Sequence, residues 1–187
     1  MHTLFTRVFG LVQVLVLALG IGWAQAGEAE DQAALDRLFA QLRVASDAAA
    51  AHAIDQQIWM LWTSPSDPTL AGRMREVLAA RGIGDLTGGI RLLDELVTDY
   101  PDYAEAWNQR ATLYYMVGRY DDSIADCARV LALEPRHFGA LSGRSLMYLQ
   151  QGRRDLALKD MATAVAIHPY LSERQLFPEL GEPATRI

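Results

Sequence analysis

Residues 104–137 (AEAWNQRATLYYMVGRYDDSIADCARVLALEPRH) decide the fold, because residues 138–171 (FGALSGRSLMYLQQGRRDLALKDMATAVAIHPYL) repeat them at an offset of 34 positions. Corresponding positions of the two stretches carry the same or similar residues: Trp107 and Leu141, Arg110 and Arg144, Ala111 and Ser145, Tyr114 and Tyr148, Asp126 and Asp160. The same period spaces the punctuating residues Pro101, Pro135 and Pro169, and Gly84, Gly118 and Gly152. A fixed period of this length is typical of proteins built from stacked repeats.

Each stretch is predicted to form two helices. In the first one, Trp107, Ala111 and Tyr114 fall at i, i+4 and i+7, which is one face of an α-helix. Gly118 then interrupts the pattern, since glycine readily takes the positive φ that ends a helix. A second apolar stripe follows and stops before Pro135, because the residue before a proline is biased away from the helical conformation. The short turn between the helices requires them to pack antiparallel, so the sequence predicts an all-α protein.

The predicted helix pairs also assign positions to two Arg–Asp pairs and to the single cysteine. Arg110 and Asp126 would lie on facing helices, and Arg144 and Asp160 repeat the arrangement, which predicts a salt bridge within each unit. The alternative is two solvated charges that never meet. Cys127 is the only cysteine, so it cannot form an internal disulfide. Its place on an apolar stripe predicts a small buried hydrophobic residue rather than a reactive thiol.

The two stretches resemble the tetratricopeptide repeat (TPR) family. Its pattern is a Trp, a Leu-Gly pair three residues later, a Tyr, a later Ala-x-x-x-Phe and a final Pro. The matching residues of the first stretch are Trp107, Arg110-Ala111, Tyr114, Gly118, Tyr120, Ser123-x-x-x-Cys127 and Pro135. Arg in place of Leu, and Ser and Cys in place of Ala and Phe, depart from the pattern. The resemblance implies a short right-handed α-solenoid of antiparallel helix pairs with an N-terminal helical cap.

The repeat frame divides the rest of the chain. Residues 70–103 keep the glycine and proline of the unit but lack its aromatic residues, so they are predicted to be a degraded unit. The predicted organisation is a signal peptide at 1–26, a divergent N-terminal helical pair at 27–69, three TPR-like units at 70–103, 104–137 and 138–171, and a short C-terminal cap helix with a tail at 172–187. The alanine-rich residues 45–53 are equally compatible with a loop or with one continuous helix.

The first residues have the features of a secretory signal. Arg7 precedes an apolar run at 8–21, and Ala24-Gln25-Ala26 supplies small residues at the positions that a signal peptidase recognises. The run is shorter than the roughly 20 residues needed to span a bilayer. We therefore expect cleavage after Ala26, a periplasmic protein and no stable membrane insertion after cleavage. An uncleaved anchor or a buried core helix is the alternative.

Composition and motifs argue against several functions. The formal net charge is −6 at pH 7, which does not attract phosphate backbones, so nucleic acid is not an expected partner. His52, His137 and His168 are far apart and form no metal-binding motif, and we expect them at the surface or in turns. Trp59 and Trp62 lie about one helical turn apart and are predicted to belong to the core. The sequence predicts no enzyme, no cofactor and no metal site.

The resemblance implies a binding surface. In such solenoids the first helix of each unit lines a concave face that holds partners. The positions that the family pattern assigns to this face include Met74, Leu78 and Arg81, then Asn108, Thr112 and Tyr115, then Ser142, Leu146 and Leu149. We expect an adaptor that holds a protein or peptide partner there. The alternatives are a self-associating structural module of the envelope, a pocket between the cap and the repeats that serves an enzyme or carrier, and a groove partly filled by the protein's own N-terminal helices.

Overall fold

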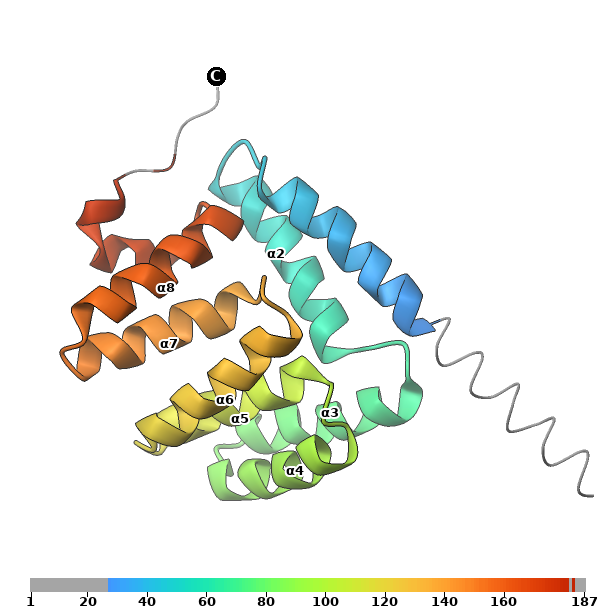
Figure 1. Ribbon diagram of the computed structural model, residues 1–187. Coiled ribbons are helices and arrows are strands. Elements are labelled where there is room, and N and C mark those ends of the chain that lie inside the picture. Colours follow the sequence, from blue (N-terminus) through green and yellow to red (C-terminus); the bar gives the residue numbers. More distant parts are fainter. Residues whose placement is uncertain (1–26, 182, 184–187) are drawn as a thin grey trace, which may run out of the picture.

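The computed structural model describes residues 27–181 and 183, which fold into a stack of helices (Figure 1). Residues 27–42 are helical and are called the N-terminal helix below. The helices that follow are α2 (Ala48–Thr63), α3 (Pro68–Gly82), α4 (Leu86–Asp99), α5 (Ala104–Met116), α6 (Tyr120–Leu133), α7 (Phe138–Gln150) and α8 (Arg154–Ile167). Two 3₁₀ helices, η1 (Ser172–Leu176) and η2 (Pro178–Leu180), end the described chain. The all-α prediction is confirmed. The predicted signal peptide lies outside the described residues.

The turn inside each helix pair has the same geometry at the repeat period. Gly84, Gly118 and Gly152 have φ values of 79°, 78° and 70°, which favour glycine. In the middle unit, the amide of Gly118 donates to the Tyr115 carbonyl at 3.0 Å, and the next amide, of Arg119, donates to the Tyr114 carbonyl at 2.8 Å. These bonds satisfy carbonyls that the end of a helix leaves without partners. The predicted glycine role is therefore confirmed.

Aspartate side chains start several of the helices. Asp67 accepts from the amides of Thr69 and Leu70, and Pro68 occupies the first turn of α3, where its missing N–H is no loss. Asp47 likewise caps α2 by accepting from the Ala50 amide. Because the chain turns at residues 43–47, the alanine-rich segment does not join the two N-terminal helices into one.

The repeats hold together through apolar contacts and one recurring ion pair. Helices α3 and α4, α5 and α6, and α7 and α8 pack as pairs. Arg110 in α5 forms a bidentate salt bridge with Asp126 in α6, at 2.7 and 2.8 Å, and Arg144 pairs with Asp160 at 2.7 and 2.9 Å. The hydrogen bonds that Arg110 donates to Asp126 raise the pKa of Arg110. Cys127 is buried in the same layer, and its burial raises the pKa of the thiol to about 12. Both predictions, the salt bridge and the buried cysteine, are confirmed.

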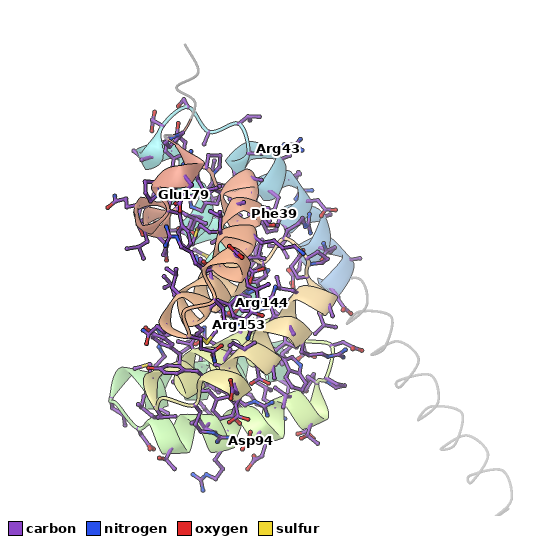
Figure 2. All side chains as sticks on the ribbon, turned by 60° about the vertical axis from the view of Figure 1, so that its left-hand side comes forward. Phe39, Arg43, Asp94, Arg144, Arg153 and Glu179 are labelled. Carbon is purple, nitrogen blue, oxygen red and sulfur yellow. The ribbon has the colours of Figure 1, made fainter. Side chains whose placement is uncertain are left out.

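Aromatic rings surround the ion pairs. The guanidinium of Arg110 lies 4.8 Å from the ring centroid of Trp107, whose indole N–H donates to the Pro101 carbonyl at 3.0 Å. In the last unit, Arg144 and Arg153 lie close together on α7 and before α8, both over the ring of Tyr148 (Figure 2). The bulky residues of the repeat pattern therefore pack beside the charges that join each helix pair.

The N-terminal helix and α2 lie side by side and pack against the last two units rather than extending the stack (Figure 1). Phe39, labelled in Figure 2, contacts Trp62 of α2 and Phe138 of α7 with ring centroids 6.0 and 6.4 Å apart. Arg136, before α7, donates to Asp36 at 2.7 Å. We call this contact, of the N-terminal helix and α2 with α5, α7 and α8, the docking interface.

The C-terminal segment differs from the predicted cap helix. Residues 172–180 form two 3₁₀ helices, and Phe177 between them is fully buried against α7 and α8. Pro178 has no N–H to donate, which prevents a continuous α-helix through the segment. In the described part of the chain, no helix is long and apolar enough to cross a membrane.

Candidate functional site

The structure brings most of the predicted binding residues to one face. Asn108 and Thr112 of α5 and Ser142 and Leu146 of α7 line a cavity of about 460 Å³ that α2 closes from the other side, and we call it the α2–α7 cavity. Tyr115 lines a smaller space of about 140 Å³ between α5 and α7. A concave face therefore lies between α5 and α7. Helix α2 covers part of it, which agrees with the alternative that the protein's own N-terminal helices partly fill the groove.

Three other predicted residues, Met74, Leu78 and Leu149, pack in the core or against it. Met74 has no exposed surface, because Leu70, Met74 and Val77 form the buried stripe of α3 that packs on α4. The prediction that Met74 faces a groove is wrong, because this apolar side chain packs into the core of α3 and α4, whereas the equivalent Asn108 and Ser142 line the cavity. Leu78 packs on the same core, and Leu149 packs on the cluster around Leu141.

The two remaining predicted residues sit at the edge of the face. Arg81 is exposed and donates to the side-chain oxygen of Gln109 at 3.0 Å. Tyr115 is 37% exposed, its ring packs on Tyr120 at 5.7 Å, and its hydroxyl accepts from Gln150 of α7 at 3.3 Å. Tyr115 thus contacts the neighbouring unit while keeping a solvent-exposed surface.

Two tryptophans attach α2 to the start of α7. The ring of Trp62 stacks on that of His137, with centroids 3.9 Å apart and planes 7° from parallel. Trp59 lies so close to Gly139 that a Cβ there would be 2.7 Å from the indole. The hydroxyl of Tyr103, before α5, donates to the carbonyl of Trp62. Trp62 belongs to the core as predicted, whereas Trp59 is half-buried and lines the α2–α7 cavity.

A buried polar network stands behind this contact. Nδ1 of His137 accepts from the Ala140 amide at 3.1 Å, so the neutral ring carries its proton on Nε2 and donates it to Glu105 at 3.0 Å. Glu105, 1% exposed, also accepts from Asn108 at 3.1 Å and Gln109 at 2.6 Å. The carboxylate is therefore satisfied by three donors, as a buried charge must be.

His137 and His168 lie in the turns between helices, as expected, but they are buried there and not at the surface. They are 0% and 4% exposed, because α2 and Phe138 cover them. Burial lowers the pKa of His168, so the ring is uncharged at neutral pH. The signal that sequence reasoning missed is the position of His137 directly before α7, where its ring nitrogen caps the helix.

Asp55 of α2 differs from the other buried carboxylates. Its side chain is 18% exposed, and its Oδ1 is the one buried side-chain nitrogen or oxygen of the described residues that lacks a hydrogen-bond partner. Its Oδ2 lies 3.8 Å from His52 Nδ1 and 4.0 Å from His168 Nε2, too far for hydrogen bonds. Desolvation raises the pKa of Asp55. No group of three His, Cys, Asp or Glu residues in the described ranges is arranged to hold a metal ion.

A second cavity of about 460 Å³ lies on the other side of α2, near the start of α5. It is also rich in carboxylates, but no buried carboxylate oxygen of these residues lacks a hydrogen-bond partner. Asp31 accepts from Ser66 at 2.7 Å, Asp67 caps α3, and Glu134 pairs with Arg136 at 2.8 Å. Of the three cavities described, only the α2–α7 cavity is lined by a residue with a buried, unpartnered carboxylate oxygen.

Comparisons with known proteins support the repeat. Residues 104–137 match the family model of the tetratricopeptide repeat. The chain is 40% identical over 109 residues to a TPR repeat-containing protein of Rhizobium etli, a match that covers 58% of this chain and 53% of that protein. The chain thus spans about half the length of the curated relative that it matches.

Solved structures show a similar fold. A crystal structure of MamA aligns with a TM-score of 0.50 at 21% identity, covering 63% of this chain and 66% of that one. A second crystal structure of MamA aligns with a TM-score of 0.49 at 20% identity, over 68% and 66% of the two chains. At this identity the likeness is one of fold. Helix pairs, the repeat match and the relative together support a TPR repeat protein, a class that generally serves as non-catalytic scaffolds.

Proposed function

We propose that this protein is a periplasmic adaptor that holds a protein or peptide partner on the face formed by α5 and α7. One observation carries the proposal: Asn108, Thr112, Ser142 and Leu146, which the family pattern assigns to the concave face, line one cavity. Solenoid proteins use this face to bind partners. The lining combines half-buried apolar side chains with a few polar groups, as binding sites commonly do.

The partner would contact the part of the face that α2 leaves open. Leu146 lines both the α2–α7 cavity and the smaller space beside Tyr115, so it lies at the centre of the available surface. An exposed tyrosine at its edge is the kind of residue that carries binding energy in protein interfaces.

A charge placed at Leu146 tests the proposal. Tagged wild type, Leu146→Glu and the control Leu156→Glu would be used to capture partners from an envelope extract, quantified by mass spectrometry. Leu156 is 36% exposed on α8 and lines none of the three cavities described above. We expect the same partner with wild type and the control, and a loss of more than tenfold with Leu146→Glu. Equal capture by a folded Leu146→Glu protein would place the partner elsewhere.

Export is the second part of the proposal. It rests on the apolar run that precedes Ala24-Gln25-Ala26. N-terminal sequencing of protein extracted from the envelope should begin at Gly27. A chain that still starts at Met1 and sediments with membranes would contradict export with cleavage.

A further inference from the structure

The α2–α7 cavity has a consistent electrostatic character. Its charged lining residues are the carboxylates Asp55 and Glu173, with the imidazoles of His52 and His168, and it includes neither lysine nor arginine. His168 does not compensate the acids, because its burial keeps the ring neutral. Burial raises the pKa of Asp55, His52 and Trp59 lower it, and the like charge of Glu173 adds a smaller increase. A cation entering the cavity would meet two carboxylates and no lysine or arginine.

Within the described residues Asp55 forms no salt bridge with a lysine or arginine, and only His52 and the indole of Trp59 lower its pKa against the effect of burial. Its Oδ1 is buried without a hydrogen bond, while the other buried carboxylates are paired: Asp126 with Arg110, Asp160 with Arg144, Glu105 with three donors. Oδ1 itself has almost no accessible surface, so a cation in the cavity would approach Asp55 through the part of its side chain that is 18% exposed. A carboxylate without a paired arginine attracts such a cation.

The walls of the cavity select the kind of cation. Trp59, Phe138 and Tyr170 contribute aromatic rings, and Asn108 and Ser142 contribute polar side chains. Aromatic faces attract cations and pack along the apolar stems of long basic side chains. A volume of about 460 Å³ admits such a side chain together with part of the segment that carries it.

We propose that the α2–α7 cavity binds a lysine or arginine side chain of an extended partner segment, with Asp55 and Glu173 neutralising the cation and Trp59 packing on its stem. This inference rests on the proposed function and specifies the partner's chemistry. The basic side chain enters between α2 and α7, so the N-terminal helical pair forms one wall of the site rather than only blocking it. Partners without a basic residue at the matching position bind more weakly.

A positional-scanning library of hexapeptides tests the inference. The peptides carry an acetylated N-terminus and an amidated C-terminus, so that only side chains bear charge, and retention by the purified, immobilised protein is measured by mass spectrometry. We expect peptides with Lys or Arg at one position to be retained at least tenfold better than those with norleucine or Glu there. Asp55→Asn and Glu173→Gln should reduce this preference at least fivefold. Asp102→Asn, which changes the same net charge at an exposed pair with Arg129, should not.

Each other outcome overturns the inference in a distinguishable way. Retention without a basic preference, lost in Leu146→Glu, would leave the adaptor proposal standing and refute the basic side chain. Retention of no peptide by folded protein would contradict both. Nα-acetyl-lysine methylamide is the competitor: if it displaces the peptides at an equal concentration, the cavity binds a free amine and not a partner segment. Circular dichroism is the check that Asp55→Asn is folded, and we expect this variant to be no less stable than wild type, because it loses a desolvated charge.

Discussion

A carboxylate inside the repeats and a carboxylate at the docking interface differ in their hydrogen-bond partners. Between α5 and α6, Asp126 is 5% exposed and receives two hydrogen bonds from Arg110. At the docking interface, the side chain of Asp55 is 18% exposed, and its buried Oδ1 receives none. The contrast indicates that the repeats are electrostatically complete by themselves, while the interface with α2 keeps an unsatisfied group. Native proteins retain such costs mainly where function requires them.

The largest expected effect concerns the packing that joins the two regions. Trp62 is 6% exposed and stacks on His137, so Trp62→Ala should lower the free energy of unfolding by about 3–5 kcal/mol. Urea unfolding followed by circular dichroism measures it, and hydrogen exchange should show residues 27–63 opening first. Met60→Ala, a neighbour on α2 that is 64% exposed, should have little effect. An unchanged midpoint for Trp62→Ala would mean that α2 does not dock as described.

A smaller loss is expected from the polar network behind this contact. Glu105→Gln replaces a carboxylate that accepts three hydrogen bonds by an amide with one acceptor oxygen, which leaves a buried donor without a partner. The expected cost is about 1–3 kcal/mol. Glu76→Gln, at an exposed position of α3, is the control. Equal stability of the two variants in urea would show that the network contributes nothing that an amide cannot replace.

The smallest effect is a dependence of stability on pH. Burial holds the pKa of His168 below its ordinary 6.5, with Asp55, His52 and Glu173 as its titratable neighbours. As the pH falls below 6.5, the unfolded chain takes up a proton that the folded chain does not, so stability decreases. His168→Asn should flatten the decrease between about pH 6.5 and 5, because this interval lies just below the ordinary histidine pKa. Thermal melts across this range check it; parallel curves for the two proteins would be the contrary result.

The sequence predicted the periodic part of the fold because its signals are local. Glycines that end first helices, prolines after second helices, and Arg110 sixteen residues before Asp126 all act within one unit, so spacing alone locates them. Met74 was misplaced because it is an apolar residue at the position of Asn108 and Ser142. It packs with Leu70 and Val77 in the core of α3 and α4 instead of lining a cavity.

The docking interface could not be predicted, since its contacts join segments far apart in the chain. His137 is buried by Trp62, 75 positions earlier, and nothing in either segment indicates the other. Asp55 gives no local signal either, because an acid on a helix is ordinarily solvated. Which carboxylate lacks a partner depends on the way α2 packs beside α7, and only the three-dimensional arrangement shows it.

The same chemical change at two carboxylates tests the central contrast most directly. Asp126→Asn removes the bidentate partner of Arg110 and leaves it only the more exposed Asp94, which should lower the free energy of unfolding at pH 7 by about 2 kcal/mol. Asp55→Asn removes a desolvated charge that has no paired arginine and should raise it by about 1 kcal/mol. Both variants and wild type would be unfolded in one urea series. Opposite signs are the predicted result; a loss of stability in both variants would contradict it, because Asp55 would then be a satisfied structural residue.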